Sequence, residues 1–190
     1  IGNPQAVPPL LIALDDDHWS VRCAAAAALG RLGSPKAIGA LSLRVEDPDP
    51  TVCRAAAAAL GEIGDPRAAG RLVRALAEPA LQPAALEALR RLGPPALPEI
   101  ERAFVSGTLT SEVRRLLVDL ASRLEDVATR RLLLSGLEDP SPLVRKDAAL
   151  ALGEGGFREA LRSLLDLKTS DPSPEVRQAA AIALRKLQPR

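Results

Sequence analysis

The chain has 190 residues, of which 47% are hydrophobic and only 2% aromatic, and its 25 basic and 24 acidic side chains leave a formal charge of +1. This composition is too apolar for a disordered chain and too interrupted for a membrane span, and it lacks the basic excess of a nucleic-acid-binding protein. Two Cys and one His leave little material for a metal centre or a disulfide framework. With no signal peptide visible, we expect a cytoplasmic protein without a cofactor.

Six similar segments follow one another along the chain. The first reads VRCAAAAALGRLG and the second VCRAAAAALGEIG, and each segment has apolar positions at i, i+3, i+4 and i+7, which predicts a helix. The segments begin at Val21, Val52, Leu81, Val113, Val144 and Val176. A further helix is predicted before each of them, over approximately residues 4–14, 35–45, 66–77, 95–105, 126–137 and 157–167.

Two kinds of turn separate these helices. Between hairpins, a Gly ends one helix, a polar residue caps the next and a Pro occupies its first turn. This pattern occurs at Gly2-Asn3-Pro4, Gly33-Ser34-Pro35 and Gly64-Asp65-Pro66. Within hairpins, Asp-Pro-x-Pro turns break one helix and start another at residues 47–50, 139–142 and 171–174.

Each helical hairpin is too small to bury its apolar face alone, so the repeats must stack. The sequence therefore predicts an all-α solenoid of about six hairpins that forms a single domain over residues 1–190. The alanine runs Ala24–Ala28 and Ala55–Ala59 are expected to let neighbouring second helices approach closely. The predicted repeats span residues 1–33, 34–64, 65–93, 94–124, 125–155 and 156–190.

The pattern D-P-x-P-x-V-R-x-x-A-A-x-A-L-G, followed by G-[DS]-P-x-A, resembles the short HEAT-like repeats of the phycobilisome-lyase type. The resemblance covers essentially the whole chain, although it is poor in the third and fourth repeats, where no Asp-Pro turn occurs. It implies a right-handed superhelix with first helices on its convex side and second helices on its concave side. It also implies that a related di-iron hydroxylase activity is excluded, because the repeated His-Glu metal ligands are missing here.

Charged residues recur at the start of the second helices and in the turns before them. They form either a charged recognition track or a structural ladder, and recurrence in most copies favours the structural ladder. Its members are Asp16, Arg22, Arg114, Asp139, Arg145, Asp171 and Arg177, with three of the aspartates six residues before an arginine. Cys23 and Cys53 are expected to be structural thiols. His18 and Trp19 are expected to pack and cap locally, with Trp19 as the alternative anchor for a partner.

The third and fourth repeats concentrate charge on the face that the second helices are expected to form. This charge is either a solvated polar surface or a patch of mixed sign that selects a protein partner by charge complementarity. The candidate partner-binding residues are Arg54, Glu87, Arg90, Arg91, Arg115, Asp119, Arg123 and Lys146.

No P-loop, G-x-S-x-G or zinc-protease motif is present, so we expect no enzymatic activity. The predicted function is a non-catalytic scaffold or regulatory module that binds another protein on its concave face. The alternative is a bilin-lyase-like subunit or a chaperone-like factor for a chromoprotein. Because residues 1–4 align with residues 63–66 between two repeats, we also expect a fragment of a longer polypeptide with further domains.

Overall fold

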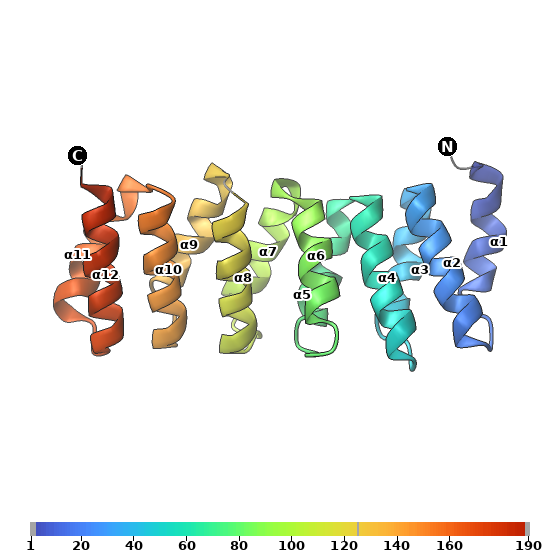
Figure 1. Cartoon of the computed structure of the whole chain (residues 1–190), viewed down its shortest axis with the longest axis horizontal. Helices are drawn as coiled ribbons and strands as arrows, with labels where there is room; N and C mark the ends of the chain where they lie inside the picture. Colours follow the sequence, from blue (N-terminus) through green and yellow to red (C-terminus); the bar gives the residue numbers. More distant parts are fainter. Residues whose placement is uncertain (1–2, 125, 189–190) are drawn as a thin grey trace. The chain divides into compact units, whose positions relative to one another are not determined.

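The computed structural model describes residues 3–124 and 126–188, and these residues form twelve α-helices and six 3-10 helices, with no strand among them. The helices pair in chain order as six hairpins, so the predicted all-α solenoid fold is confirmed (Figure 1). The first helices are α1 Val7–Ala13, α3 Ile38–Arg44, α5 Ala69–Ala75, α7 Leu97–Val105, α9 Arg130–Gly136 and α11 Leu161–Ser170. The second helices are α2 Trp19–Leu32, α4 Pro50–Ile63, α6 Gln82–Leu92, α8 Ser111–Arg123, α10 Pro142–Glu154 and α12 Pro174–Leu187.

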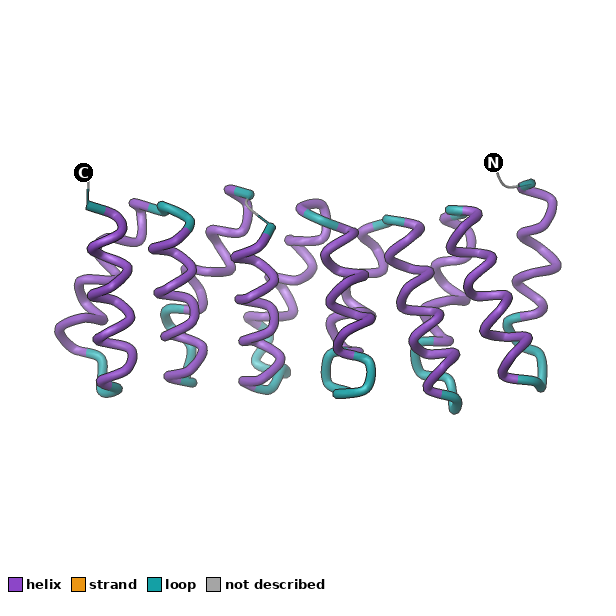
Figure 2. Tube along the Cα trace, viewed as in Figure 1, coloured by secondary structure: helices purple, strands orange, loops and turns teal. Residues whose placement is uncertain are grey.

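Every first helix opens with a 3-10 turn, and short loops separate it from its partner (Figure 2). Gly33 and Gly64 end α2 and α4 in the left-handed conformation, with φ of 62° and 74°. The Asp65 side chain then accepts a hydrogen bond from the Arg67 N–H, as a helix cap does. Ser34 occupies the same position but makes no side-chain cap bond. The predicted pattern at Gly2 and the alignment of Ile1 lie outside the described residues, as does the predicted start of the fifth repeat at residue 125.

The chain divides into two compact units, residues 1–100 and 101–190, with the boundary inside α7. In the N-terminal unit α2 packs on α4 and α4 packs on α6. In the C-terminal unit α8 packs on α10 and α10 packs on α12. Fully buried leucines of both units fill the space between helices, among them Leu29, Leu60, Leu117 and Leu152. The single domain over residues 1–190 therefore stays a prediction.

Glycines create the closest contact between neighbouring second helices. A Cβ atom on Gly153 would lie 2.5 Å from the Cα of Ala183, a distance that real Cβ atoms do not reach. Three such pairs occur in the two units: Gly30 with Ala59, Gly61 with Ala88, and Gly153 with Ala183. We call these pairs the glycine–alanine seam. The alanine runs contribute only in part, because Ala26 is buried whereas Ala24 is exposed.

Candidate partner-binding surface

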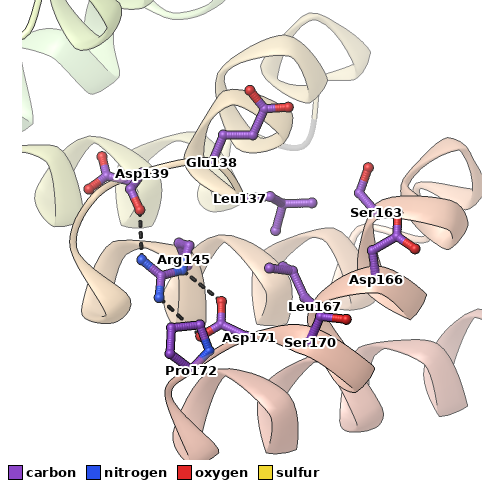
Figure 3. Close-up of a pocket in the computed structure, with 10 residues that line it drawn as sticks. All are labelled: Leu137, Glu138, Asp139, Arg145, Ser163, Asp166, Leu167, Ser170, Asp171 and Pro172. Carbon is purple, nitrogen blue, oxygen red and sulfur yellow. Dashed lines mark hydrogen bonds and ion pairs between the residues drawn. The ribbon is translucent and has the colours of Figure 1, made fainter.

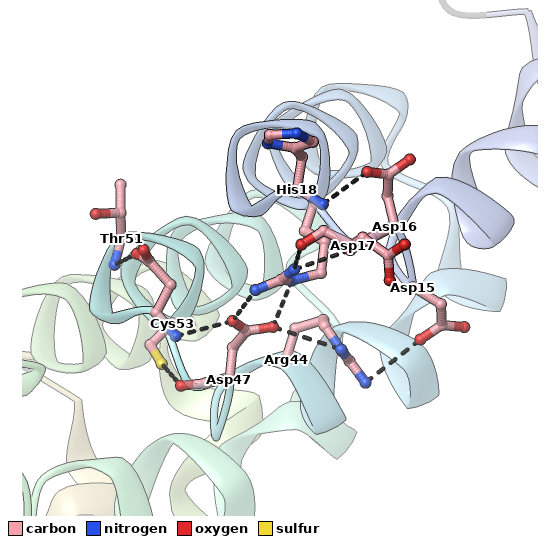
Figure 4. Close-up of polar contacts among 10 residues, drawn as sticks. Asp15, Asp16, Asp17, His18, Arg44, Asp47, Thr51 and Cys53 are labelled. Carbon is pink, nitrogen blue, oxygen red and sulfur yellow. Dashed lines mark hydrogen bonds and ion pairs between the residues drawn. The ribbon is translucent and has the colours of Figure 1, made fainter.

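Arg22, at the start of α2, hydrogen-bonds to two turns of the chain, the one before α2 and the one before α4. Its Nε and Nη2 donate to the two carboxylate oxygens of Asp47 at 2.9 and 2.7 Å, while Nη1 donates to the main-chain oxygens of Asp16 and Asp17 at 2.8 and 3.0 Å. Asp47 belongs to the next hairpin and its side chain is 0% exposed. Figure 4 shows Asp47 at the centre of these contacts. The bidentate pair therefore ties the first repeat to the second.

The same arrangement recurs in the C-terminal unit. Arg145 Nε and Nη2 donate to the carboxylate of Asp171 at 2.8 and 3.0 Å, and Nη1 donates to the main-chain oxygen of Asp139 at 2.8 Å (Figure 3). One repeat earlier, Arg114 donates to the carboxylate of Asp139 at 2.6 and 3.0 Å. In the last repeat, Arg177 Nη1 donates to the main-chain oxygen of Asp171 at 2.7 Å. These contacts make an arginine–aspartate ladder.

The spacing of six residues marks a contact through the main chain and not through the carboxylate. Asp16, Asp139 and Asp171 offer their main-chain oxygens to the arginines six residues later, whereas the carboxylates that Arg22 and Arg145 bind come from the following repeat. The main-chain oxygen of Asp16 accordingly accepts a hydrogen bond from Arg22 Nη1 at 2.8 Å. The Asp16 Oδ1 atom accepts a hydrogen bond from the His18 N–H, also at 2.8 Å. The spacing rule did not identify Asp47 as a member of the ladder, because the residue six positions after it is Cys53 and not an arginine. A spacing of 25 residues from Arg22 would have identified it.

Two repeats keep the main-chain contact without an arginine. Cys53 takes the ladder position in the second repeat, and its Sγ donates to the main-chain oxygen of Asp47 at 3.0 Å. Gln82 takes it in the third, where Nε2 donates to the main-chain oxygen of Leu76 at 3.1 Å. Both cysteines are free thiols, and burial raises the pKa of Cys53. Cys53 thus serves the structure by bracing its own turn.

Acid is expected to weaken the ladder. The Arg145 guanidinium lowers the pKa of Asp171 below its ordinary value of 3.8, against a smaller effect of burial that raises it. Burial would raise the pKa of Asp47, but hydrogen bonds from Arg22 and the Asp49 N–H outweigh it and lower the pKa. Because the folded state holds these carboxylates ionised, their stabilisation is present above about pH 5 and is lost as pH falls through about 4 and below.

This pH dependence can be measured by urea unfolding between pH 7 and pH 2.5. The Asp171→Asn variant should lose stability at neutral pH and show a flatter pH profile, so that its difference from the unaltered chain shrinks in acid. Glu138→Gln, at an exposed position of the same unit, provides the matched control. A difference between the Asp171→Asn variant and the unaltered chain that stays constant across the pH range would contradict the ladder's role.

Three of the candidate residues of the N-terminal unit, Glu87, Arg90 and Arg91, form a local cluster on α6. Glu87 accepts hydrogen bonds from Arg90 at 2.8 Å and from Arg91 at 2.9 Å, and the three side chains are about half exposed. The Arg90 contact, followed by that of Arg91, lowers the pKa of Glu87 to about 2. On α4, Arg54 contacts the Thr51 hydroxyl at 3.3 Å. The cluster therefore presents fixed charges of both signs to solvent.

Two of the other candidate residues, Arg115 and Asp119, line a groove between α8 and α10 in the C-terminal unit. The groove has a volume of about 510 Å³. Arg115 donates to Asp147 across it at 2.7 Å, and Lys146 lies 3.8 Å from the same carboxylate. Arg123 pairs with Asp119 at 3.0 Å on α8. The half-buried side chains of Leu116 and Leu150 form the apolar lining of the groove. The structure thus places Arg115 and Asp119 along this groove, which we call the α8–α10 groove, whereas Arg123 and Lys146 only pair with carboxylates that line it.

A second hollow of about 510 Å³ lies beside the ladder in the C-terminal unit, and sequence reasoning did not anticipate it. Leu137 and Leu167 form its apolar walls, while Asp139, Arg145 and Asp171 lie along it (Figure 3). These three residues already hydrogen-bond to one another within the ladder. Asp139 and Asp171 are buried within the ladder, whereas the ion pairs at the α8–α10 groove are partly exposed, so this hollow is a weaker candidate than that groove.

His18 and Trp19 begin the second helix of the first repeat. His18 holds the expected N-cap position of α2, where its main-chain oxygen accepts from the Val21 and Arg22 N–H groups at 3.0 and 3.2 Å, whereas its side chain makes no cap hydrogen bond. Trp19 is 48% exposed.

Within the described residues, no group of three or more His, Cys, Asp or Glu side chains is placed to hold a metal ion. No helix in that part of the chain has the length and apolarity needed to cross a membrane.

Stacked helical hairpins of this kind define an α-solenoid repeat protein. HEAT repeats match residues 1–47, 39–118 and 108–185, so the chain belongs to the HEAT-repeat family. The expected family is confirmed at this level. No curated protein matches the sequence.

Solved structures with the same fold come from several sources. A chain from a structure on microtubule plus-end tracking by XMAP215, CLIP-170 and EB1 has 17% identity and a TM-score of 0.64, covering 94% of this chain and 90% of that one. An archaeal HEAT-like repeats protein from Thermococcus onnurineus NA1 has 16% identity and a TM-score of 0.52, covering 97% and 88%. The complex of CpcE and CpcF of phycocyanin lyase from Nostoc sp. PCC7120 contributes a chain with 25% identity and a TM-score of 0.50, covering 98% and 84%.

Proposed function

We propose that this chain is a non-catalytic scaffold that binds another protein through the face lined by its second helices. HEAT repeats commonly mediate protein binding. The observation that carries the proposal is the α8–α10 groove, which combines apolar side chains with charged pairs at its rim. Protein interfaces have this composition, with an apolar centre and a polar surround.

The ion pairs of the groove determine which partner it selects. Arg115–Asp147 and Arg123–Asp119 present charges of opposite sign at the groove, so a partner with the complementary order of charges gains contacts with both pairs. Leu116 and Leu150 add the apolar area that such a contact buries. The balance of signs favours a protein surface over a polyanion, because a nucleic acid would require a basic excess.

Charge reversal tests the proposal. The double variant Arg115→Glu/Arg123→Glu should reduce recovery of the partner at least tenfold in affinity capture from the native lysate. The new carboxylates lie next to Asp147 and Asp119 and repel the acidic groups of the partner that the two arginines would bind. The matched control is Arg158→Glu/Arg162→Glu, which makes the same change of charge at exposed positions of the 3-10 turn Arg158–Ala160 and of α11. Circular dichroism should show that both variants stay folded. Equal recovery by the two double variants would contradict the assignment of this face.

The similarity to the phycocyanin-lyase chain supports a second candidate function, because it extends over 98% of this chain at 25% identity. In this alternative, the repeats are of the phycobilisome-lyase type and the chain is a lyase-like subunit or chaperone-like factor that holds a chromoprotein. Mixing the chain with a bilin and an apo-phycobiliprotein should then change the absorption spectrum of the bilin. An unchanged spectrum leaves the protein-binding scaffold as the function to pursue.

A further inference from the structure

The α8–α10 groove lies where the glycine–alanine seam is interrupted. Ser122 stands on α8 at the position that Gly153 holds on α10, and Ala151 takes the position of Ala183 in the following repeat. In the three pairs of the seam, a Cβ atom on the glycine would lie only 2.5 to 2.8 Å from the Cα of the facing alanine. Because Ser122 has a Cβ atom, α8 and α10 cannot approach as closely at this point. Ser122 and Ala151 both line the groove that remains.

One face of α8 carries charges of alternating sign beside this groove. Glu112, Arg115, Asp119 and Arg123 follow one another at helical spacings of three or four residues, so they lie on the same side of the helix. We call these four residues the alternating row. The side chains of Arg115, Asp119 and Arg123 are 41, 57 and 70% exposed, and Glu112 forms no ion pair within residues 3–124 and 126–188. The row is therefore accessible to a partner over about three turns, or about 16 Å.

The walls of the groove favour a helical occupant over an extended one. All the residues that line it belong to α8 or α10, and main-chain groups inside a helix are already hydrogen-bonded to one another. An extended segment on Leu116 and Leu150 would therefore bury main-chain N–H and C=O groups without partners. A helix pairs these groups internally, and it presents an apolar stripe and charges at the same spacings as the alternating row.

We propose that the partner of this chain inserts an amphipathic α-helix into the α8–α10 groove, an inference that rests on the proposed function. The apolar stripe of the partner helix packs on Leu116 and Leu150. Its charges run in the order opposite to the alternating row, so that each basic side chain faces a carboxylate of the row and each acidic side chain faces an arginine. The helix needs about eleven residues to meet the whole row.

Synthetic peptides test this inference on the whole chain. The two probes are fluorescein-labelled helical peptides of about fifteen residues with leucines along one face. One probe carries Lys, Glu, Lys and Glu beside the leucines for a helix parallel to α8, and the other carries the reverse order for an antiparallel helix. Fluorescence anisotropy should show that one of them binds, more weakly as salt is added. A central proline should weaken its binding at least tenfold, because proline breaks a helix and not an extended segment.

A charge swap gives the sharpest readout. Glu112→Lys should weaken binding of that probe at least tenfold, because a lysine of the probe then faces a lysine. A probe with glutamate in place of this lysine should regain binding to the Glu112→Lys variant. Glu138→Lys makes the same change of charge at an exposed position outside the lining of the groove and should leave binding unaltered.

Three outcomes would overturn the helical occupant: neither probe binds, the proline-containing peptide binds as well as its parent, or the swapped probe fails to regain binding. The proposed function fails by a separate result, namely equal recovery of the partner from the lysate by the charge-reversed double variant and its control. A partner that depends on Arg115 and Arg123 while both peptides fail to bind would leave the scaffold in place and refute the helix.

Discussion

Replacing Gly153 with valine is expected to destabilise the C-terminal unit by about 3 kcal/mol, as overpacking of a tight interior contact does. The Cβ atom of the new side chain would lie 2.5 Å from the Cα of Ala183, which is backbone and cannot rotate away. α10 and α12 must therefore separate, and the contacts between them weaken. Chemical unfolding monitored by circular dichroism measures the loss.

Gly39 supplies the matched control for this experiment. It lies within α3, and a Cβ atom at this position would meet nothing within 4 Å. Gly39→Ala should therefore stabilise the chain by about 0.5–1 kcal/mol, because alanine loses less conformational freedom than glycine in a helix. Gly153→Val with a stability within about 0.5 kcal/mol of the unaltered chain would refute the glycine–alanine seam as a close contact.

Replacing Arg145 with methionine should cost about 3 kcal/mol, because it leaves the Asp171 carboxylate without its charge partner. The Asp171 side chain is only 2% exposed and accepts two hydrogen bonds from Arg145. Methionine keeps much of the aliphatic bulk, so the loss reports the guanidinium and not the packing. Urea unfolding at pH 7 measures it.

Arg123→Met provides the comparison on the surface of the same unit. The Arg123 side chain is 70% exposed and pairs with Asp119 within one helix, so its removal should cost no more than about 0.5 kcal/mol. The double variant Arg145→Met/Asp171→Asn should recover part of the stability lost by Arg145→Met, because no buried charge then remains unpaired. Equal losses for Arg145→Met and Arg123→Met would show that the ladder does not join the repeats.

The candidate surface was predicted only in part. Sequence alignment of the repeats identified Arg115 and Asp119, and the structure places both along the α8–α10 groove. It did not identify Asp147, which pairs with Arg115, because the two residues are 32 positions apart. The residues on α6 belong to the N-terminal unit and those on α8 to the C-terminal unit. A single patch that spans both therefore stays a prediction.

Local signals in the sequence were enough to predict the six hairpins, their order and most of the helix boundaries. These features depend on local signals, namely apolar spacing within one helix, the left-handed Gly33 and Gly64, and proline in the first turn. Tertiary structure alone decided which carboxylate each arginine binds and that glycines form the seam between second helices. Those contacts join residues one repeat apart, and only the packing of neighbouring hairpins brings such residues within hydrogen-bond or van der Waals distance.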